Sequence, residues 1–187
     1  MDGYGDAKSL IFMGLDLSLT STGVSVGGKT FSIKSKLRGI QRLVEISEQV
    51  IESAKKTNPA IVILEGYSYG SKFSRAHALG ELGGAVKVGL HLAGFRIVEV
   101  PPKCRAKFAT GNGNASKNDV MAFMALNFPG LFAKTCGDDE YDAWVLEQMG
   151  YAQIGECSFR WSNSQLLGLK RVDWSPLYEA LGGKIDG

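Results

Sequence analysis

The chain opens with three short apolar runs that have the length and residue types of β-strands. They span residues 9–17, 22–27 and 30–36, and the third alternates apolar with polar positions, which is the period of a half-buried strand. Two glycines and a lysine at 27–29 predict a tight hairpin turn between the second and third strands. A fourth run, 60–66, stays apolar until it ends in an acid, as a buried central strand does.

The segments between and after these strands carry helix signals. Over residues 40–54 apolar positions recur every three or four residues with charges opposite, which predicts an amphipathic helix that ends before Pro59. A helix rich in glycine and alanine is predicted over 75–93, and a fifth strand over 95–102. The glycine- and alanine-rich helix is suited either to close packing in a dimer or to packing against the sheet.

Residues 103–116 are basic and glycine-rich, and we expect them to form a loop. Its glycines let a phosphate approach the backbone, although a flexible surface loop would have the same composition. Ser116 and Asp119 have the spacing of a capping box, which predicts a helix that begins at Ser116 and runs to about Asn127.

The last strong helix is predicted over residues 138–149, with Asp138 as its N-cap and Gly150 as its end. Residues 1–150 then make one domain, and 151–187 a C-terminal extension with an edge hairpin and a short helix after Pro176. This extension could serve dimerisation, DNA contact or simple cover of the core, and the sequence does not rank these roles.

The order of elements is three strands, helix, strand, helix, strand and two helices. This order is the ribonuclease H-like arrangement, an α/β fold in which helices flank a mixed five-stranded sheet. In it the first and fourth strands are neighbours, so Asp16 and Glu65 should point into one crevice at the strand ends. Asp139 and Asp142 lie three residues apart on one helix face and could join them.

Each acid also has an ordinary structural explanation, as a turn or cap residue or as a first-turn acid that answers the helix dipole. Together, however, the four carboxylates should repel one another by roughly 4 kcal/mol per close pair. Nothing nearby in the sequence supplies enough fixed positive charge, so either the acids take up protons or divalent cations bind. Oxygen ligands favour magnesium, with manganese as a substitute.

The charge of the chain is polarised although its net value is only +2. Residues 66–118 hold eight basic side chains and two acids, whereas 138–147 hold five acids and no base. The basic segment is either a solvated face or a groove for a polyanion. Tyr67 and Tyr69, close in sequence to Lys72 and Arg75, suit stacking on unpaired bases. Aromatic residues buried in the core would look the same in the sequence.

Composition excludes several other classes of protein. No run reaches the roughly 18 apolar residues of a membrane span, and the first ten residues do not have the pattern of a signal peptide. The three scattered cysteines, Cys104, Cys136 and Cys157, favour a reducing, cytoplasmic setting without disulfides or structural zinc. No phosphate-binding Walker motif precedes Lys117, so no nucleotide cofactor is expected.

Four segments carry a family resemblance. GLDLSLTSTGVSV, VILEGYSYG, GNGNASKNDV and DDEYDAWVL resemble the signature segments of RuvC-type Holliday-junction resolvases and their phage relatives. The resemblance covers about residues 10–150. It implies a two-metal-ion endonuclease that acts on branched DNA as a homodimer.

The resemblance also implies roles for individual residues. Asp16, Glu65, Asp139 and Asp142 would be metal ligands and catalytic acids, and Lys107 and Lys117 would contact DNA on either side of the glycine loop. Where the resolvases have an aromatic that stacks at the junction centre, this chain has Ser68, and Tyr67 or Tyr69 would take its place. The basic side chains nearby complete the predicted DNA-binding set: Lys72, Arg75, Lys103 and Arg105.

Other readings stay open at this stage. The first segment is also similar to the phosphate loop of actin-like and sugar-kinase ATPases, although the chain is short for the two domains that those folds need. A second hypothesis is a protein that binds branched DNA without cutting it. Within the nuclease interpretation, a flap or fork endonuclease is the alternative to a resolvase of four-way junctions.

Overall fold

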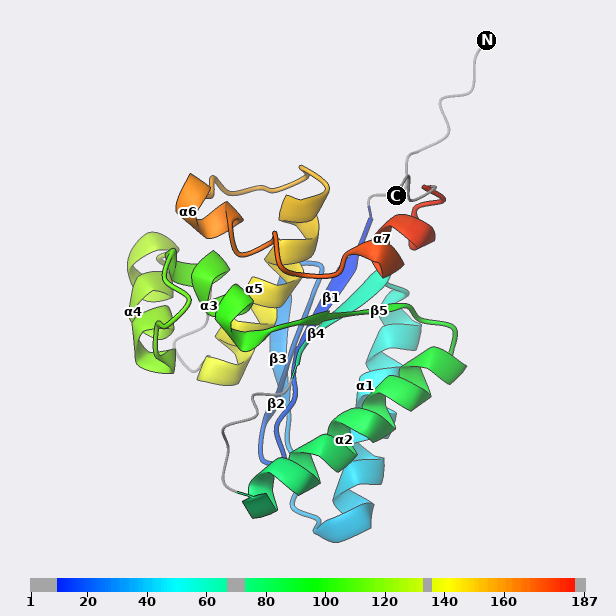
Figure 1. The fold of residues 1–187 in the computed structure, drawn as a ribbon. Helices are drawn as coiled ribbons and strands as arrows, with labels where there is room; N and C mark the ends of the chain where they lie inside the picture. The colour runs from blue at the N-terminus through cyan, green and yellow to red at the C-terminus, as the bar shows by residue number, and fades with distance from the viewer. Residues whose placement is uncertain (1–9, 67–72, 133–135, 184–187) are drawn as a thin grey trace.

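The computed structural model describes residues 10–66, 73–132 and 136–183, with side chains of the second range from residue 77 onward (Figure 1). At its centre lies a sheet with the strand order β3-β2-β1-β4-β5. The strands are β1 (Phe12–Asp16), β2 (Thr22–Val26), β3 (Lys29–Ile33), β4 (Ile61–Glu65) and β5 (Ile97–Val100). The first three form an antiparallel meander, and β4 and β5 extend the sheet in parallel with β1. The predicted mixed five-stranded sheet is confirmed.

Helices cover both faces of this sheet (Figure 1). One face carries α1 (Gly39–Thr57) and α2 (Phe73–Leu92), which bury their apolar side chains against Met13 and Leu15 of β1. The other face carries α5 (Asp138–Gln153), with α3 (Pro102–Thr110) and α4 (Lys117–Asn127) packed beside it. Within the described residues, no helix is both long enough and apolar enough to cross a bilayer.

Two glycines let α5 lie directly on the sheet. A Cβ atom at Gly14 of β1 would overlap the carbonyl oxygen of Ala143, and one at Gly23 of β2 would overlap that of Asp139. Only residues without a side chain permit this approach of helix backbone to strand backbone. Since side chains alternate along a strand, Asp16 lies on the same face as Gly14 and therefore points toward α5.

The predicted end of α5 is wrong. The helix continues through Gly150 to Gln153, because Gly150 serves packing rather than termination. A Cβ there would lie 2.6 Å from the Cδ1 of Ile63 and 2.9 Å from the Cγ of Phe12, so the glycine lets the helix lie close to the sheet. The predicted N-cap is also wrong, since Gly137 holds that position and Asp138 is the first helical residue.

Residues 103–116 are not the predicted loop. Most of them belong to α3 (Pro102–Thr110), which begins at a pair of prolines and ends where Gly111 adopts a φ of 83°. A short glycine-containing connection then leads to α4 (Lys117–Asn127). The predicted capping box is confirmed there: the Ser116 hydroxyl accepts from the Asp119 N–H, and the Asp119 carboxylate accepts from the Ser116 N–H.

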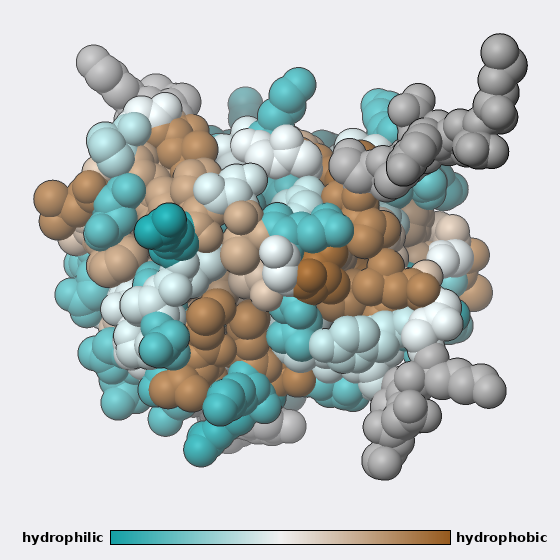
Figure 2. Space-filling model, turned by 90° about the horizontal axis from the view of Figure 1, so that it is seen from above, coloured by the Kyte–Doolittle hydropathy of each residue, from teal (hydrophilic) through white to brown (hydrophobic). Residues whose placement is uncertain are grey.

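The C-terminal segment covers part of the core. It contains α6 (Asn163–Leu166) and α7 (Ser175–Ala180), and the predicted edge hairpin is wrong, since the described residues after β5 form no strand. Trp161, Trp174 and Leu177 are buried with residues of α3 and α5 in one apolar cluster. Figure 2 shows the end of the molecule where α6 and α7 lie, with hydrophobic areas interrupted by hydrophilic side chains. The predicted domain boundary at residue 150 stays a prediction.

Candidate metal centre

Three acidic side chains meet at one edge of the sheet. Asp16 ends β1 and Glu65 ends β4, and because these strands are parallel neighbours their carboxyl ends lie side by side. Asp142 reaches the same place from the first turns of α5. One carboxylate oxygen from each of the three residues lies within 4.8 Å of the other two. The structure thus brings together three of the four acids that the sequence singled out.

Asp139, the fourth acid, lies beside this group rather than in it. Its Oδ1 atom is 3.6 Å from the Nζ of Lys117, and the same Nζ lies 3.7 Å from Asp142. Both aspartates therefore face the same way from α5, as their spacing predicted. Asp138 also reaches Lys117, at 3.4 Å, and is more exposed than Asp139.

Two cationic side chains contact the acids, although nothing nearby in the sequence was expected to supply enough fixed positive charge. Arg105 of α3 donates from Nε to Glu65 Oε2 at 2.9 Å and from Nη1 to Asp142 Oδ1. Lys117, at the start of α4, lies within 3.7 Å of Asp16. These residues are distant in sequence from β1 and β4, which carry Asp16 and Glu65, and the packing of α3 and α4 against α5 brings them to the site.

Arg105 was predicted to contact DNA, and the structure places it elsewhere. Its residue surface is only 5% exposed, and its guanidinium group is directed to carboxylates instead of solvent. Its neighbours on α3 explain this position, because Cys104, Ala106 and Phe108 are buried too. Because Lys103 and Lys107 stand on either side of it in a basic stretch, no local sequence signal marked Arg105 as the partner of buried carboxylates.

The pKa values show that the centre holds more negative charge than it can easily accommodate. Burial raises the pKa of Asp16 well above its ordinary value, and the charges of Glu65 and Asp142 raise it further. Burial likewise raises the pKa of Asp142 to about 6, although Arg105 acts in the opposite direction. Burial would lower the pKa of Lys117, but the surrounding carboxylates outweigh it and the pKa rises.

The carboxylates fit a divalent metal ion. Asp16 Oδ2 and Asp142 Oδ2 are buried and have no hydrogen-bond partner among the residues that the structure describes. The Lys117 ammonium group, a cation, lies 3.7 Å from each of these two atoms, beyond hydrogen-bond distance. Unpartnered carboxylate oxygens that converge with a third carboxylate are the donor set that hard divalent cations prefer. Asp16, Glu65 and Asp142 are the residues that could hold such an ion.

The predicted DNA-binding residues have different positions. Lys103 is exposed and Lys107 half-buried on α3, whereas Lys117 extends from α4 toward the acids. The rest of the set cannot be placed: Tyr67, Tyr69 and Lys72 lie outside the described residues, as does the side chain of Arg75.

Comparison with known proteins gives a consistent result. No protein-family model matches the chain. The crossover junction endodeoxyribonuclease RuvC of Bdellovibrio bacteriovorus is 31% identical over 84 residues, which are 45% of this chain and 50% of that protein. The chain therefore spans about half the length of the curated relative that it matches.

Solved structures show the likeness of the fold. Thermus thermophilus RuvC has a TM-score of 0.63 at 22% identity, with 79% of this chain and 98% of that chain covered. A structure of T. thermophilus RuvC in complex with a Holliday junction substrate has the same TM-score and identity, with 97% of that chain covered. The sequence and the ribonuclease H-like fold of this chain are thus both similar to those of RuvC-type Holliday-junction resolvases, as the four sequence segments indicated.

Proposed function

We propose that this protein is a metal-dependent endonuclease that hydrolyses phosphodiesters in branched DNA, with four-way junctions as its substrate. The observation that carries the proposal is the meeting of Asp16, Glu65 and Asp142 within 4.8 Å at the strand ends. The likeness to RuvC, one structure of which is a complex with a Holliday junction substrate, gives the substrate class.

The proposed cofactor is magnesium, two ions per site, with manganese able to replace it. Bound there, the ions would lower the pKa of a water molecule and stabilise the leaving oxygen of the phosphodiester. The side chains Asp16, Glu65 and Asp142 would hold them, with Asp139 as a fourth ligand at the edge of the group. No Ser-His or Cys-His pair is needed as a nucleophile in this chemistry.

Arg105 and Lys117 have distinct tasks in this proposal. Arg105 is buried and fixes the orientation of Glu65 and Asp142 through one nitrogen each, so it acts as a positioning residue. The side chain of Lys117 is 52% exposed. Its long, flexible stem lets the ammonium group turn from the acids toward a phosphate of the DNA. Lys103 and Lys107 on α3 would bind neighbouring phosphates.

A homodimer completes the proposal, since two active sites are needed to cut two strands of one junction. The face of α2 that carries small residues is one surface on which two copies could meet. The proposed location is the cytoplasm, the reducing setting that the three scattered cysteines favour.

The experiment compares cleavage of a four-way junction, a fork, a flap and linear duplex DNA, with magnesium and with excess chelator. We expect paired, symmetric nicks in the junction that depend on the metal. Asp16→Asn and Glu65→Gln should lose cleavage while junction binding persists. Glu52→Gln, an exposed acid of α1 on the other face of the sheet, is the matched control and should cut normally.

The outcomes separate the alternatives. Single cuts in the flap or the fork would indicate a flap or fork endonuclease of the same fold. Junction binding without any nick, equal with and without metal, would indicate a binding protein and contradict the enzymatic proposal. Cleavage by Asp16→Asn at a normal rate would remove that residue from the mechanism.

A further inference from the structure

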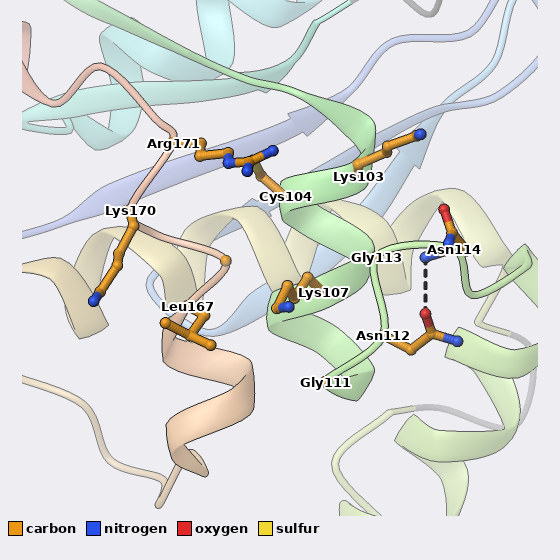
Figure 3. Close-up of a pocket in the computed structure, with 11 residues that line it drawn as sticks. Lys103, Cys104, Lys107, Gly111, Asn112, Gly113, Asn114, Leu167, Lys170 and Arg171 are labelled. Atoms are coloured by element: carbon orange, nitrogen blue, oxygen red, sulfur yellow. Dashed lines mark hydrogen bonds between the residues drawn. The ribbon is translucent and has the colours of Figure 1, made fainter.

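A basic cavity lies beside α3 (Figure 3). Its volume is about 690 Å³, and it is lined by α3, by the glycine-containing connection after it, and by the turn that follows α6. Lys103 and Lys107 are one helical turn apart and share a face of α3. Arg105, two residues from each, points roughly the opposite way at about 100° per residue. One helix thus contributes to the acidic centre on one side and to the cavity on the other.

All charged residues that line the cavity are basic. Lys103 and Lys107 come from α3, Lys170 and Arg171 come from the turn after α6, and no acid is among the lining residues. Within the described parts of the chain, none of these four side chains makes an ion pair with a carboxylate. Four cations around one hollow, with no carboxylate among the lining residues, indicate an anionic ligand.

The C-terminal segment is packed against α3, which anchors the backbone that carries the exposed side chains of Lys170 and Arg171. Gln165 donates from its buried Nε2 to the carbonyl oxygen of Ala109 at 3.0 Å. A Cβ atom at Gly168 would lie 2.7 Å from the Cys104 carbonyl oxygen and 2.7 Å from the Phe108 nitrogen, so this turn lies directly on the helix.

Aromatic packing adds to this attachment. The rings of Trp161 and Phe108 lie 4.3 Å apart between centroids, which ties the start of the C-terminal segment to the buried side of α3. A backbone that is already ordered loses little conformational freedom when a ligand binds, and this favours affinity.

The glycine-containing connection forms the third wall. Gly111 has a φ of 83°, and a Cβ at Gly113 would lie 3.0 Å from the carbonyl oxygen of Lys103, so the chain passes close to α3. Asn114 donates its N–H to Asn112 Oδ1 at 3.0 Å, the contact drawn as a dashed line in Figure 3. This wall presents backbone and amide groups instead of bulky side chains, and a phosphate can approach such a surface closely.

We propose that this cavity binds backbone phosphates of the DNA substrate, and that Lys170 and Arg171 thereby make the C-terminal segment part of the DNA-binding surface. The inference rests on the proposed function for the identity of the polyanion. The proposal places phosphate contacts on the side of α3 that faces away from the acids, in addition to the contact proposed for Lys117. One DNA strand would then follow this helix.

The test uses the double variant Lys170→Ala/Arg171→Ala. Each phosphate contact adds about 0.9 to the slope of log affinity against log salt concentration. We therefore expect the slope for a labelled four-way junction to fall by about one to two, with at least a tenfold loss of affinity near 0.1 M salt. Binding is measured in chelator, where the wild type does not cut. Lys55→Ala/Lys56→Ala on α1 removes two exposed charges on the opposite face of the sheet and is the control.

Each outcome decides the matter. A slope and an affinity equal to those of the control variant overturn the inference even if the wild type cuts junctions normally. Tight junction binding by the wild type, with weaker binding and a reduced slope in the double variant but no cleavage by the wild type, supports the inference and contradicts the enzymatic proposal. If inorganic phosphate or ATP binds the wild type at micromolar concentration and the variant loses only that binding, the cavity serves a free anion and the DNA assignment is wrong.

Discussion

Asp142→Asn offers the sharpest test of the electrostatics at the metal centre. The residue is 2% exposed and its carboxyl group has a pKa raised by burial from 3.8 to about 6. Between these two values the unfolded chain has lost the proton that the folded chain still holds. Stability therefore falls as the pH rises through this window, and the ionised carboxylate destabilises the metal-free protein at every higher pH.

The magnitude follows from the size of the shift. About two pKa units correspond to roughly 3 kcal/mol, at about 1.4 kcal/mol for each unit. An asparagine has the same shape and carries no charge, so it escapes this cost. In excess chelator at pH 8, we expect Asp142→Asn to raise the free energy of unfolding by up to about 3 kcal/mol. Near pH 4, where the wild-type carboxyl group is protonated in the folded state, the two proteins should be nearly equal.

The assay is urea unfolding followed by circular dichroism at pH 4 and pH 8, with chelator and with magnesium. Magnesium should stabilise the wild type by mass action and the variant much less, because a ligand is lost. Asp173→Asn is the control, since its exposed carboxylate has a pKa lowered by hydrogen bonds from Ser175 and should give no gain at pH 8. If Asp142→Asn is less stable than the wild type in chelator at pH 8, Arg105 more than compensates the buried charge, and the reasoning is refuted.

Three further substitutions test other parts of the structure. Gly14→Ala should lower the free energy of unfolding by about 3 kcal/mol or more, since the added Cβ overlaps the α5 backbone. Gly84→Ala on α2, where a Cβ meets nothing within 4 Å, is the control and should be neutral or stabilising. Equal effects of the two substitutions in urea titrations would contradict the close packing. Arg105→Gln should lower the free energy of unfolding by about 3–5 kcal/mol because it leaves buried carboxylates without their partner. A decrease below about 1 kcal/mol in the same titrations would show that the pairing is dispensable for stability. Burial raises the pKa of Glu147, so its contribution to stability declines as the pH rises. Glu147→Gln should therefore flatten the pH dependence of the free energy of unfolding between pH 4 and 8 and leave junction cleavage intact. An unchanged pH dependence would argue against a buried charge at this position.

The sequence predicted the features that depend on local pattern. Short apolar runs separated by turns identified all five strands, and the spacing of Ser116 and Asp119 identified a capping box that the structure contains. The meeting of Asp16 and Glu65 followed from strand order alone, because parallel neighbours end at the same edge of a sheet.

The features that the sequence did not reveal depend on tertiary packing. Nearly all of α3 was assigned to a loop because its lysines and nearby glycines obscure a single buried face. Gly150 was taken as a helix end, since nothing local distinguishes a terminating glycine from one that lies against a sheet. The countercharge from Arg105 could not be derived, because its contact with Glu65 joins elements 40 residues apart.

The geometry of the acids follows from the same close packing of α5 on the sheet. Gly23 is the register partner of Asp16 and lies under the backbone of Asp139, while Gly14 lies under Ala143, the neighbour of Asp142. Where helix and strand backbones nearly touch, short aspartate side chains suffice to bring two carboxylates together, and longer ones would overlap. Glu65 comes from β4, on the side of β1 away from β2, and its extra methylene group lets it span the greater distance. The glycines of β1 and β2 therefore determine the spacing of the carboxylates as directly as the acids themselves do.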